Sequence, residues 1–159
     1  MCCHTFHFDI SIPDRYVEGQ GIVSPIRGPG HDFLGIRSPL EGDAAYSGLE
    51  LQILDNTADI YKDLEDYQYH GSAYGLIPAK RGFLKPVGEW NYQEVIVDGS
   101  KVKVILNGTT ILEGDLEEAG KNPLDGVEHP GLDRKKGHIG FLGHGSEVWF
   151  RNIRIKELE

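Results

Sequence analysis

Short runs in which apolar and polar residues alternate recur along the whole chain. Residues 6–12 place an apolar side chain at every second position, and residues 49–53 repeat the pattern. This period of two is typical of a strand that buries one face. Runs of the same kind occur at residues 33–37, 73–77, 90–98, 101–106, 109–113, 138–142 and 147–156. About nine short strands predict two packed antiparallel sheets, an all-β sandwich.

Glycine and proline separate these runs. The chain of 159 residues contains 21 Gly and 8 Pro, spread over its length, and it shows no internal repeat. We therefore expect a single β-sandwich domain over residues 1–159. At most one short helix is expected, at residues 55–66, where an aspartate recurs every four positions. The charged stretch at residues 114–137 is the longest predicted loop, and loops of this length often form a lid or a wall of a site.

Two local features of the strands can be predicted in more detail. The pair Asn107-Gly108 predicts a two-residue type I′ turn, because both residues tolerate a positive φ. The resulting register places Val104 opposite Ile111. In the last predicted strand the apolar positions change parity, and a bulge near Asn152 would return them to one buried face.

The charge balance excludes some partners. With 16 Lys and Arg against 25 Asp and Glu, the formal net charge is −9 and the pI is about 5.2. Binding to nucleic acid or to anionic lipid requires a basic face, and no apolar run reaches the length of a membrane span. Neither nucleic acid nor a membrane is therefore an expected partner. The first residues show no basic region followed by an apolar stretch, so no signal peptide is visible and no localisation is assigned.

Residues 49–53 carry the most informative polar pair. If the apolar side chains of this strand face the core, Glu50 and Gln52 share the opposite face, about 7 Å apart. Such a pair suits hydrogen bonding to a sugar ring, and Asp55 would join it if the strand bulges. The spacing Glu-x-Gln-x-x-Asp resembles the Glu-x-Asp-x-x-Glu signature of laminarinase- and lichenase-type jelly-roll glycosidases. Because Gln52 replaces the middle carboxylate, the match indicates a shared architecture more than a shared mechanism. Taken alone, the pair is better explained as the solvated face of an ordinary strand.

Five segments occur in an order that resembles a known family. They include Gly-Ile-Arg-Ser-Pro at residues 35–39 and His-Gly-Ser-Ala-Tyr-Gly at residues 70–75, and the others are residues 48–56, 85–91 and 144–156. Together they resemble the 3-keto-disaccharide hydrolase domain family, a family of bacterial domains, over roughly residues 35–158. The resemblance implies a concanavalin A-like jelly-roll sandwich that acts on 3-keto-glycosides. Many members are secreted or periplasmic.

Two parts of the chain depart from the pattern of that family. The sequence upstream of Gly35 matches poorly, so residues 6–12 replace a family strand or the N-terminal part is truncated. A sandwich that lacks strands exposes edges, and we therefore expect self-association, to a homo-oligomer, through the N-terminal region. Many members carry Gln just before a His-Gly pair, where this chain has Leu142-Gly143-His144. Any role of that glutamine does not carry over.

The chemistry that the resemblance implies needs one base. A ketone at C3 of a sugar acidifies the C2 hydrogen, a base removes it, and the enediolate expels the substituent at C1 before water adds back. Such a site requires a base of tuned pKa, a proton donor for the leaving oxygen and positive charge near the enediolate. Glu50 is the candidate base, with His144 or His70 as the alternative base or the acid partner. Arg37 is the candidate that holds the oxyanion.

Other residues would hold the substrate. The substrate-binding candidates are Gln52, Asp55, Tyr74, His70 and Trp90. Gln52 and Tyr74 would orient the ring through hydrogen bonds, and Trp90 would offer it an aromatic face. Structural roles compete with each assignment, since Arg37 can pair with a carboxylate across the sheet, Trp90 can pack in the core and either histidine can cap a turn.

The sequence leaves two alternatives open, a divalent cation as cofactor and a binding function without catalysis. No metal is assigned and no cofactor is certain, although a divalent cation at Glu50 and a histidine could stabilise the enediolate. An acidic cluster suited to calcium is better explained as a solvated face: Asp55, Asp59, Asp63, Glu65 and Asp66. The expected partner is a small carbohydrate, a 3-keto-glycoside. The alternative function is a non-catalytic carbohydrate-binding sandwich, because fold does not fix function.

Overall fold

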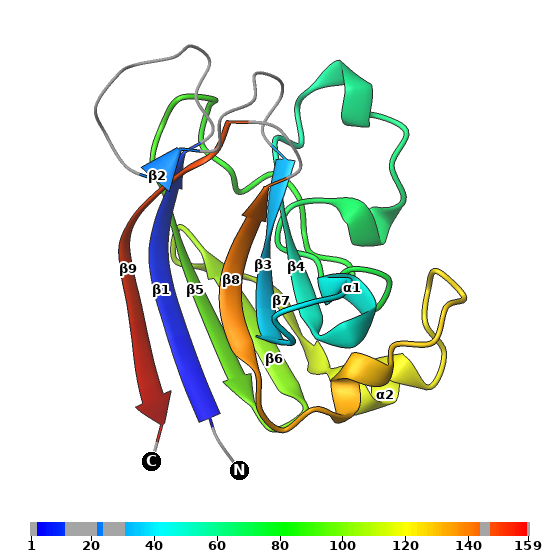
Figure 1. Cartoon of the computed structure of the whole chain (residues 1–159). Coiled ribbons are helices and arrows are strands. Elements are labelled where there is room, and N and C mark those ends of the chain that lie inside the picture. Colours follow the sequence, from blue (N-terminus) through cyan, green and yellow to red (C-terminus); the bar gives the residue numbers. More distant parts are fainter. Residues whose placement is uncertain (1–2, 12–21, 24–30, 144–146, 159) are drawn as a thin grey trace.

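The chain folds into two antiparallel sheets packed face to face (Figure 1). The computed structural model describes residues 3–11, 22–23, 31–143 and 147–158. Its strands are β1 (Cys3–Ser11), β2 (Ile22–Val23), β3 (His31–Ser38), β4 (Leu49–Leu54), β5 (Asn91–Asp98), β6 (Lys101–Leu106), β7 (Thr109–Asp115), β8 (His138–Gly143) and β9 (Trp149–Leu158). The larger sheet has the order β2-β9-β1-β5-β6-β7 and the smaller has the order β4-β3-β8. The predicted all-β sandwich is confirmed.

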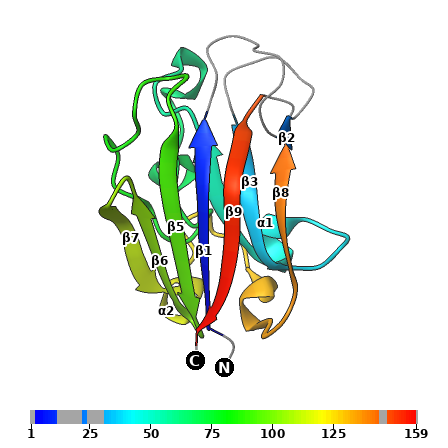
Figure 2. The ribbon, with the colours of Figure 1, turned by 90° about the vertical axis from the view of Figure 1, so that its left-hand side faces the viewer.

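The N-terminal strand lies inside the larger sheet. β1 pairs with β5 on one side and with β9 on the other (Figure 2). Its apolar side chains Phe6, Phe8 and Ile10 are all buried against the smaller sheet. β1 therefore has no free edge, and self-association through the N-terminal region stays a prediction.

The core lies between the sheets and uses one face of each strand. Alternate residues of β3 and β4 face it, including Leu34, Ile36, Leu51 and Ile53. The larger sheet contributes mainly the alternating side chains of β1, β5 and β6 to this core. This arrangement leaves the other face of the smaller sheet available for polar side chains, because successive residues of a strand point to opposite faces.

The run at residues 73–77 does not form a strand. Ala73 and Ile77 exchange two backbone hydrogen bonds of 3.0 Å, which closes a tight turn in which Gly75 has a φ of 70°. The residues just before the turn follow the edge of β4 instead: Tyr74 N donates to Glu50 O and Gln52 N donates to Ser72 O, both at 3.0 Å. The alternation therefore marks a segment that extends the smaller sheet beyond β4.

The helix expected at residues 55–66 is absent. This stretch contains only a 3₁₀ turn, η1 (Asp59–Tyr61), and a second turn, η2 (Asp66–Gln68), follows it. Asp55 accepts hydrogen bonds from Thr57 N at 2.9 Å and Thr57 Oγ1 at 2.6 Å, which favours a turn at this point. The segment has few apolar residues to form a buried helical stripe, and Ile60 is exposed.

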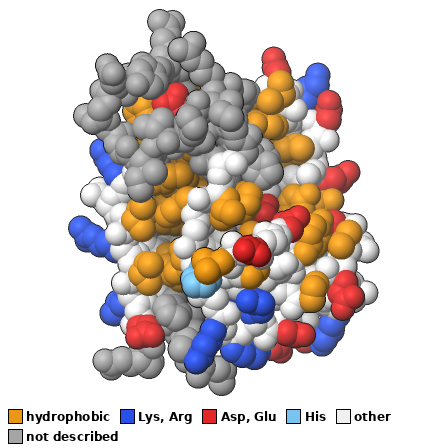
Figure 3. Space-filling model, viewed as in Figure 1, with side chains coloured by type: hydrophobic (Ala, Val, Ile, Leu, Met, Phe, Trp, Pro, Cys, Tyr) orange, Lys and Arg blue, Asp and Glu red, His pale blue; other side chains and the backbone are white. Residues whose placement is uncertain are grey.

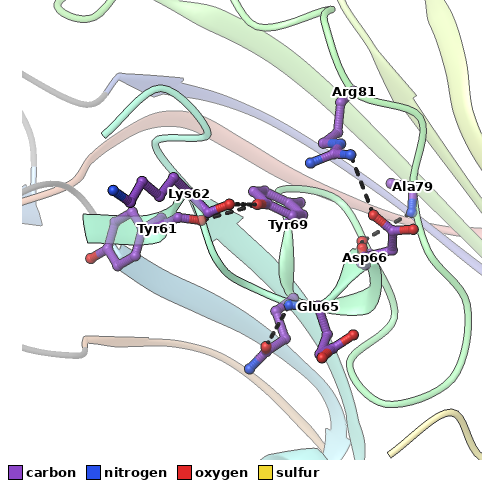
Figure 4. Close-up of polar contacts among 9 residues, drawn as sticks. Tyr61, Lys62, Glu65, Asp66, Tyr69, Ala79 and Arg81 are labelled. Carbon is purple, nitrogen blue, oxygen red and sulfur yellow. Dashed lines mark hydrogen bonds and ion pairs between the residues drawn. The ribbon is translucent and has the colours of Figure 1, made fainter. Parts of the chain in front are cut away.

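Side-chain contacts hold this segment in place of a helix (Figure 4). The Tyr69 hydroxyl donates to Tyr61 O at 3.0 Å and to Lys62 O at 3.2 Å. Asp66 pairs with Arg81 at 3.3 Å, and the Arg81 guanidinium lies 4.2 Å from the centre of the Tyr69 ring. The stretch between β4 and η2 is therefore fixed as an irregular wall over the outer face of the smaller sheet.

The α-helices lie elsewhere in the chain. In the described residues there are two, α1 (Ala44–Ser47) and α2 (Leu116–Gly120), one more than expected. Aspartates cap both: Asp43 Oδ1 accepts from Ala45 N at 3.0 Å, and Asp115 Oδ1 accepts from Glu117 N at 3.0 Å. The predicted long loop at residues 114–137 contains α2 and a 3₁₀ turn, η3 (Pro130–Asp133), and it packs against α1.

The hairpin turn is confirmed but its register is not. Asn107 and Gly108 have φ values of 51° and 85°, as a type I′ turn requires. Val104 lies opposite Leu112 rather than Ile111, because a bulge follows Val104 in the pairing of β6 with β7. The bulge allows both Ile111 and Leu112 to be buried.

The bulge in β9 is confirmed, but the face of β9 that points to the core is not buried along its whole length. The register shifts between Arg151 and Arg154, and Asn152 has a φ of 53°. Ile155 then lies opposite Phe6 on the core side, yet 55% of its surface is exposed. The described part of the opposite sheet has only three strands, so it does not cover β9 at this point.

Candidate active site

Two polar side chains of β4 project from the outer face of the smaller sheet. Because Leu49, Leu51 and Ile53 face the core, Glu50 and Gln52 face away from it, as the alternation predicts. Both are nonetheless buried, since the segments around β4 cover this face. The site is thus a covered face of a sheet and not a solvated one.

The neighbouring strands place small residues beside the acid. Gly35 of β3 lies opposite Glu50, and Gly140 of β8 lies opposite Gly35. In the next row, Phe33 lies opposite Gln52 and Leu142 lies opposite Phe33. The absence of a side chain at Gly35 lets other side chains approach the sheet beside Glu50: a Cβ on Gly35 would lie 2.8 Å from Ser38 Oγ, 3.3 Å from Leu142 Cδ1 and 3.5 Å from Ala44 Cβ.

A cavity of about 540 Å³ lies over these rows. Its floor is the outer face of the smaller sheet. Its walls come from α1, from the stretch between β4 and η2, from η2 itself and from the turn at residues 73–77. It is lined by Phe33, Gly42, Asp43, Ala44, Ala45, Tyr46, Glu50, Gln52, Tyr61, Leu64, Gln68, Tyr74 and Leu142. A volume of this size falls in the range of small-molecule sites. The structure therefore brings together three of the predicted site residues, Glu50, Gln52 and Tyr74.

The environment of Glu50 sets its proton affinity. Burial, and to a lesser degree the negative charge of Asp43, raise the pKa of Glu50 to about 7. Only 6% of the residue is exposed, and the Gln52 side-chain amide donates to Glu50 Oε1 at 2.7 Å. A carboxyl group with such a pKa accepts and returns a proton near neutral pH, which is the property of a general base.

A histidine and an aspartate of the long loop support the α1 wall. His129 Nδ1 donates to Ala45 O at 3.0 Å, and His129 Nε2 lies 3.1 Å from Asp125 Oδ2. The Tyr46 ring lies 4.9 Å from the His129 ring. Burial, the neighbouring Tyr74 and the negative charge of Asp125 raise the pKa of Tyr46, and its hydroxyl also forms a hydrogen bond with the Asp125 side chain.

The lack of a side chain at Gly75 leaves room for the carboxyl group of Asp125. Gly75 has a φ of 70°, and a Cβ on it would overlap Asp125 Oδ2 and lie 2.7 Å from His129 Nε2. The Leu124 amide donates to Gly75 O at 2.7 Å, which ties the loop to this turn. The loop at residues 114–137 thus supports α1 and the turn at Gly75 from behind, and none of its residues lines the cavity, so its expected role as a lid or a wall of the site is not confirmed.

The close approach of Gly131 to α1 leads to a stability prediction. A Cβ on Gly131 would overlap Gly48 N and Ser47 C and would lie 2.7 Å from Tyr46 O. We expect Gly131→Ala to destabilise the fold by about 1–3 kcal/mol, because backbone atoms must move. Chemical denaturation followed by tryptophan fluorescence measures the change.

A second glycine provides the control for this variant. Gly120 ends α2, and a Cβ there meets only the terminal methyl of Leu132, at 2.8 Å. That methyl can shift, so Gly120→Ala should change stability by less than about 1 kcal/mol. Equal stability of Gly131→Ala and the wild type would contradict the docking of the loop on α1.

Arg37 and His70 lie away from the cavity. The Arg37 guanidinium donates to Gly99 O at 2.8 Å in the turn between β5 and β6, and the residue borders a different depression with Lys135 and Lys136. His70 is buried between the sheets, where its Nδ1 accepts from Leu54 N at 3.3 Å and its Nε2 donates to Gln93 Oε1 at 2.8 Å. Burial lowers the pKa of His70 to about 4, so it is neutral at pH 7.

The remaining candidates do not line the cavity in the part of the chain that the structure describes. Asp55 caps the turn after β4 and borders another depression with Leu84 and Pro86. Trp90 packs beneath Arg151, whose guanidinium lies 3.9 Å from its ring. His144 follows Leu142 by two positions but is outside the described residues. Asp55 and Trp90 thus have structural roles in these contacts.

No group of three or more potential metal ligands forms among residues 3–11, 22–23, 31–143 and 147–158. In the acidic cluster, Asp55 accepts from Thr57 and Asp66 pairs with Arg81. The cavity itself has two carboxylates, Glu50 and Asp43, and the second caps α1.

Several residues of the site are absent from the sequence-based candidates. Asp43, Tyr46, Tyr61 and Gln68 line the cavity, and His129 supports it with Asp125 from behind. An N-capping aspartate and a His four positions after an Asp were visible signals. They did not point to a site because the segments meet only in the folded chain.

Within the described residues, no helix is long and apolar enough to span a membrane.

Comparison with known proteins identifies relatives along nearly the whole chain. The model of the 3-keto-alpha-glucoside-1,2-lyase-like domain family matches residues 6–156. The matched range begins within β1, upstream of residues 35–158, over which the sequence segments resemble the family. A 3-keto-disaccharide hydrolase of Bacteroides thetaiotaomicron is 33% identical in an alignment 130 positions long, which covers 71% of this chain and 45% of that protein. The chain therefore spans about half the length of this curated relative.

Solved structures confirm the fold. A Parabacteroides distasonis ATCC 8503 protein named "putative glycosyl hydrolase" superimposes with a TM-score of 0.72 at 24% identity, covering 98% of this chain and 78% of that one. The carbohydrate binding module CBM66 of Bacillus subtilis superimposes with a TM-score of 0.56 at 16% identity, covering 98% and 76%. With a sandwich of this type, a covered acid on its smaller sheet and a family match that extends from β1 into β9, the chain belongs to the 3-keto-alpha-glucoside-1,2-lyase-like domain family.

Proposed function

We propose that this protein cleaves 3-keto-α-glucosides by base-promoted elimination across C1 and C2, followed by addition of water. The observation that carries the proposal is the carboxyl of Glu50, which is buried at the cavity floor with a pKa of about 7. The names of the family and of the curated relative supply the substrate class. Both the lyase and the hydrolase in those names fit one mechanism, since elimination cleaves the glycoside and hydration completes hydrolysis.

Glu50 is the base in this mechanism. Its carboxylate removes the proton from C2, and the electron pair of that bond moves toward the C3 carbonyl to form an enediolate. The enediolate then expels the C1 oxygen, which takes a proton as it leaves, and C1 and C2 become doubly bonded. Water adds its hydroxyl to C1 and a proton returns to C2. One base therefore serves both halves of the reaction.

The other polar residues of the cavity hold and protonate the substrate. Gln52 fixes the orientation of the Glu50 carboxyl through its 2.7 Å hydrogen bond. The hydroxyl of Tyr74, a residue that lines the cavity, can donate to the enediolate oxygen or to the leaving oxygen. His144 stays the sequence-based candidate for the acid. Arg37, whose guanidinium is bound to Gly99 O, takes no part in this proposal.

The number of carboxylates favours elimination over direct displacement. A retaining glycosidase uses two carboxyl groups about 5 Å apart, one as nucleophile and one as acid. In this cavity Gln52 stands two residues from Glu50, and Asp43 is engaged as the cap of α1. An elimination that starts from C2 requires a single base of raised pKa, which this site has.

The alternative function is a non-catalytic carbohydrate-binding module. The structural similarity to CBM66 is the observation that favours it. A binding module has no need of a buried acid that titrates near neutral pH. Burying such an acid costs stability and is typical of sites where proton transfer occurs. Turnover therefore distinguishes the two functions.

The test compares a 3-keto-α-glucoside with its parent α-glucoside. Only the ketone acidifies the C2 hydrogen, so we expect release of the aglycone from the keto compound alone. Deuterium at C2 should lower kcat/KM for the keto compound, measured in competition with the unlabelled substrate by mass spectrometry. Cleavage of both glucosides at similar rates, or an isotope effect of one, would overturn the elimination, and absence of any turnover would favour the binding module.

A further inference from the structure

The sequence motif that begins at Gly35 contains a bulge at the end of β3. Gly35 lies opposite Gly140 of β8 and Ser38 lies opposite His138, so β3 has one residue more than β8 between these pairs. Arg37, inside the bulge, has a φ of 54°, a conformation that is uncommon for a residue other than glycine. Bulges of this kind re-aim a side chain and are frequent beside active sites.

The bulge exchanges the faces on which Arg37 and Ser38 lie. Ile36 faces the core, so strict alternation would place Arg37 on the outer face of the smaller sheet and Ser38 in the core. Instead, the Arg37 guanidinium donates to Gly99 O in the turn between β5 and β6 of the larger sheet, at 2.8 Å. Ser38 Oγ lies on the outer face, 2.8 Å from the point that a Cβ on Gly35 would occupy. The bulge therefore turns the serine hydroxyl toward the face that forms the cavity floor.

Contacts with the segment before β8 hold the bulge in this form. Gly137 packs so closely that a Cβ on it would overlap the backbone of Arg37. Arg134 Nε donates to Arg37 O at 3.2 Å. A strained residue persists only where the surrounding structure determines its conformation, and such residues cluster at functional sites. The position of the Ser38 hydroxyl is therefore imposed by the fold.

The Ser38 hydroxyl is buried beside Glu50 without a hydrogen bond. Gly35 is the strand partner of Glu50, and Gly48 precedes Glu50 by two residues on the same face. A Cβ on Gly48 would lie 2.5 Å from Ser38 Oγ, so the hydroxyl fills the space that these two glycines leave next to Glu50. Only 7% of Ser38 is exposed, and its Oγ has no hydrogen-bond partner in the described part of the chain.

A buried hydroxyl without a partner is unfavourable, because it has lost its bonds to water. Leu142 Cδ1 and Ala44 Cβ approach the same point above Gly35, to 3.3 and 3.5 Å. Hydrophobic side chains also gather over the middle of the face where β8 and β3 lie (Figure 3). A hydroxyl that is kept in such surroundings indicates a partner that is available in one state of the site. Glu50 is the neighbour that changes state, since it takes and returns a proton in the proposed reaction.

We propose that Ser38 is a positioning residue for the general base: when Glu50 loses its proton, the Ser38 hydroxyl rotates and donates a hydrogen bond to the carboxylate. This inference rests on the proposed function. Gln52 binds Glu50 Oε1 from one side along β4, and Gly48 and Ser38 lie on the other side. Rotation about its Cα–Cβ bond moves a serine oxygen among three staggered positions. Because a carboxylate accepts about four hydrogen bonds, two donors can hold it and leave a lone pair for the C2 proton.

Removal of the Ser38 hydroxyl should make the carboxylate of Glu50 less favourable. A donor to a carboxylate favours its charged form, so Ser38→Ala should raise the pKa of Glu50 above its value of about 7. The other ionisable side chains of the cavity stay in place in this variant: Asp43, whose charge acts on Glu50, Tyr46, Tyr61 and Tyr74. A change in the titration of Glu50 is therefore assigned to the lost hydroxyl.

The test compares the wild type with Ser38→Ala and Ser38→Cys. Carbon NMR of the Glu50 carboxyl follows its titration without any turnover, and we expect the midpoint to rise by about 0.5–1 pH unit in Ser38→Ala. For a 3-keto-α-glucoside, kcat at neutral pH should fall by about three- to tenfold. KM should change by less than about twofold, because Ser38 does not line the cavity. Ser38→Cys fills similar space with a weak donor and should behave as Ser38→Ala does.

A second buried serine provides the matched control. The Ser72 hydroxyl donates to Asp66 O at 3.3 Å and accepts from Ala79 N at 2.9 Å. Ser72→Ala removes both bonds and should lower the urea midpoint of unfolding at pH 5, where Glu50 holds its proton. Ser38→Ala removes a hydroxyl without a partner and should leave that midpoint unchanged or raise it. The titration of Glu50 should not move in Ser72→Ala.

The outcomes separate this inference from the proposed function. A titration of Glu50 that is the same in Ser38→Ala and the wild type would overturn the role of Ser38 and leave the elimination in place. A urea midpoint at pH 5 that falls as far in Ser38→Ala as in Ser72→Ala would show that the hydroxyl has a structural partner, and would also overturn it. Absence of turnover by the wild type, together with a raised titration midpoint in Ser38→Ala, would overturn the proposed function and keep the hydrogen bond between Ser38 and Glu50.

Discussion

Replacing Glu50 with glutamine should lower kcat for a 3-keto-α-glucoside by about 10²–10⁴-fold, the usual contribution of a general base. The variant keeps the shape of the side chain and an oxygen that can accept from Gln52, but it has no group that can take the C2 proton. Substrate affinity should persist, because the hydrogen-bonding groups of Gln52, Gln68 and Tyr74 are unchanged. Initial rates at saturating substrate, with calorimetric titration of the unreactive parent glucoside, measure both quantities.

The pH profile adds a second readout to this variant. The pKa of Glu50 is about 7, so the carboxylate that acts as base becomes the major form above that pH. The wild-type kcat/KM should therefore rise with pH through about 7 and level off above it. The residual activity of Glu50→Gln should lack this rise.

An exposed glutamate provides the matched control. Glu113 of β7 is paired with Lys103 at 3.0 Å and is not among the residues that line the cavity. Glu113→Gln makes the same chemical change and should retain wild-type kcat. Wild-type turnover by Glu50→Gln would show that another group removes the C2 proton, and the proposed mechanism would then be wrong.

The same substitution should stabilise the fold at alkaline pH. The pKa of Glu50 is raised from 4.5 to about 7 in the folded protein, so the native state holds a proton that the unfolded chain has lost between these values. The stability of the wild type falls as pH rises through this window and is constant above it. At about 1.4 kcal/mol per unit, the loss reaches about 3 kcal/mol at pH 8. Glu50→Gln has no ionisable group at this position and avoids the loss.

Urea denaturation at two pH values measures this effect. The free energy of unfolding of Glu50→Gln should exceed that of the wild type by up to about 3 kcal/mol at pH 8 and by about zero near pH 4. Glu113→Gln removes an exposed ion pair and should change stability by less than about 1 kcal/mol. A difference between Glu50→Gln and the wild type that does not depend on pH would contradict the raised pKa. Stabilisation together with lost turnover would show that the acid is retained for function at a cost in stability.

The period-two pattern predicted the strands well because one face of most of them packs in the core. β1, β4 and β5 follow the alternation of their sequences, and the Asn107-Gly108 turn follows from the φ values that these residues tolerate. The run at residues 73–77 has the same pattern but forms a turn. Gly75 takes a positive φ there, and the loop with Asp125 and His129 packs against it. Such contacts between distant segments leave no trace in a local pattern.

The helix expected at residues 55–66 is a second predicted element that does not form. A spacing of four between aspartates suggested one face of a helix, although these residues carry little apolar surface to bury. In the fold, Asp55 caps a turn and Tyr69 holds the backbone at Tyr61 and Lys62. The segment serves as a cavity wall, and its conformation is set by what it covers.

The sequence by itself determined the sandwich, the orientation of Glu50 and Gln52 away from the core, and the family resemblance in the segments around them. The tertiary structure alone decided that this face is covered, that Asp43 lies close enough to raise the pKa of Glu50 further, and that Arg37 and His70 serve other contacts. The physical reason is the range of each effect. Strand alternation is a property of neighbouring residues, whereas burial and electrostatic coupling depend on segments that the chain brings together only on folding.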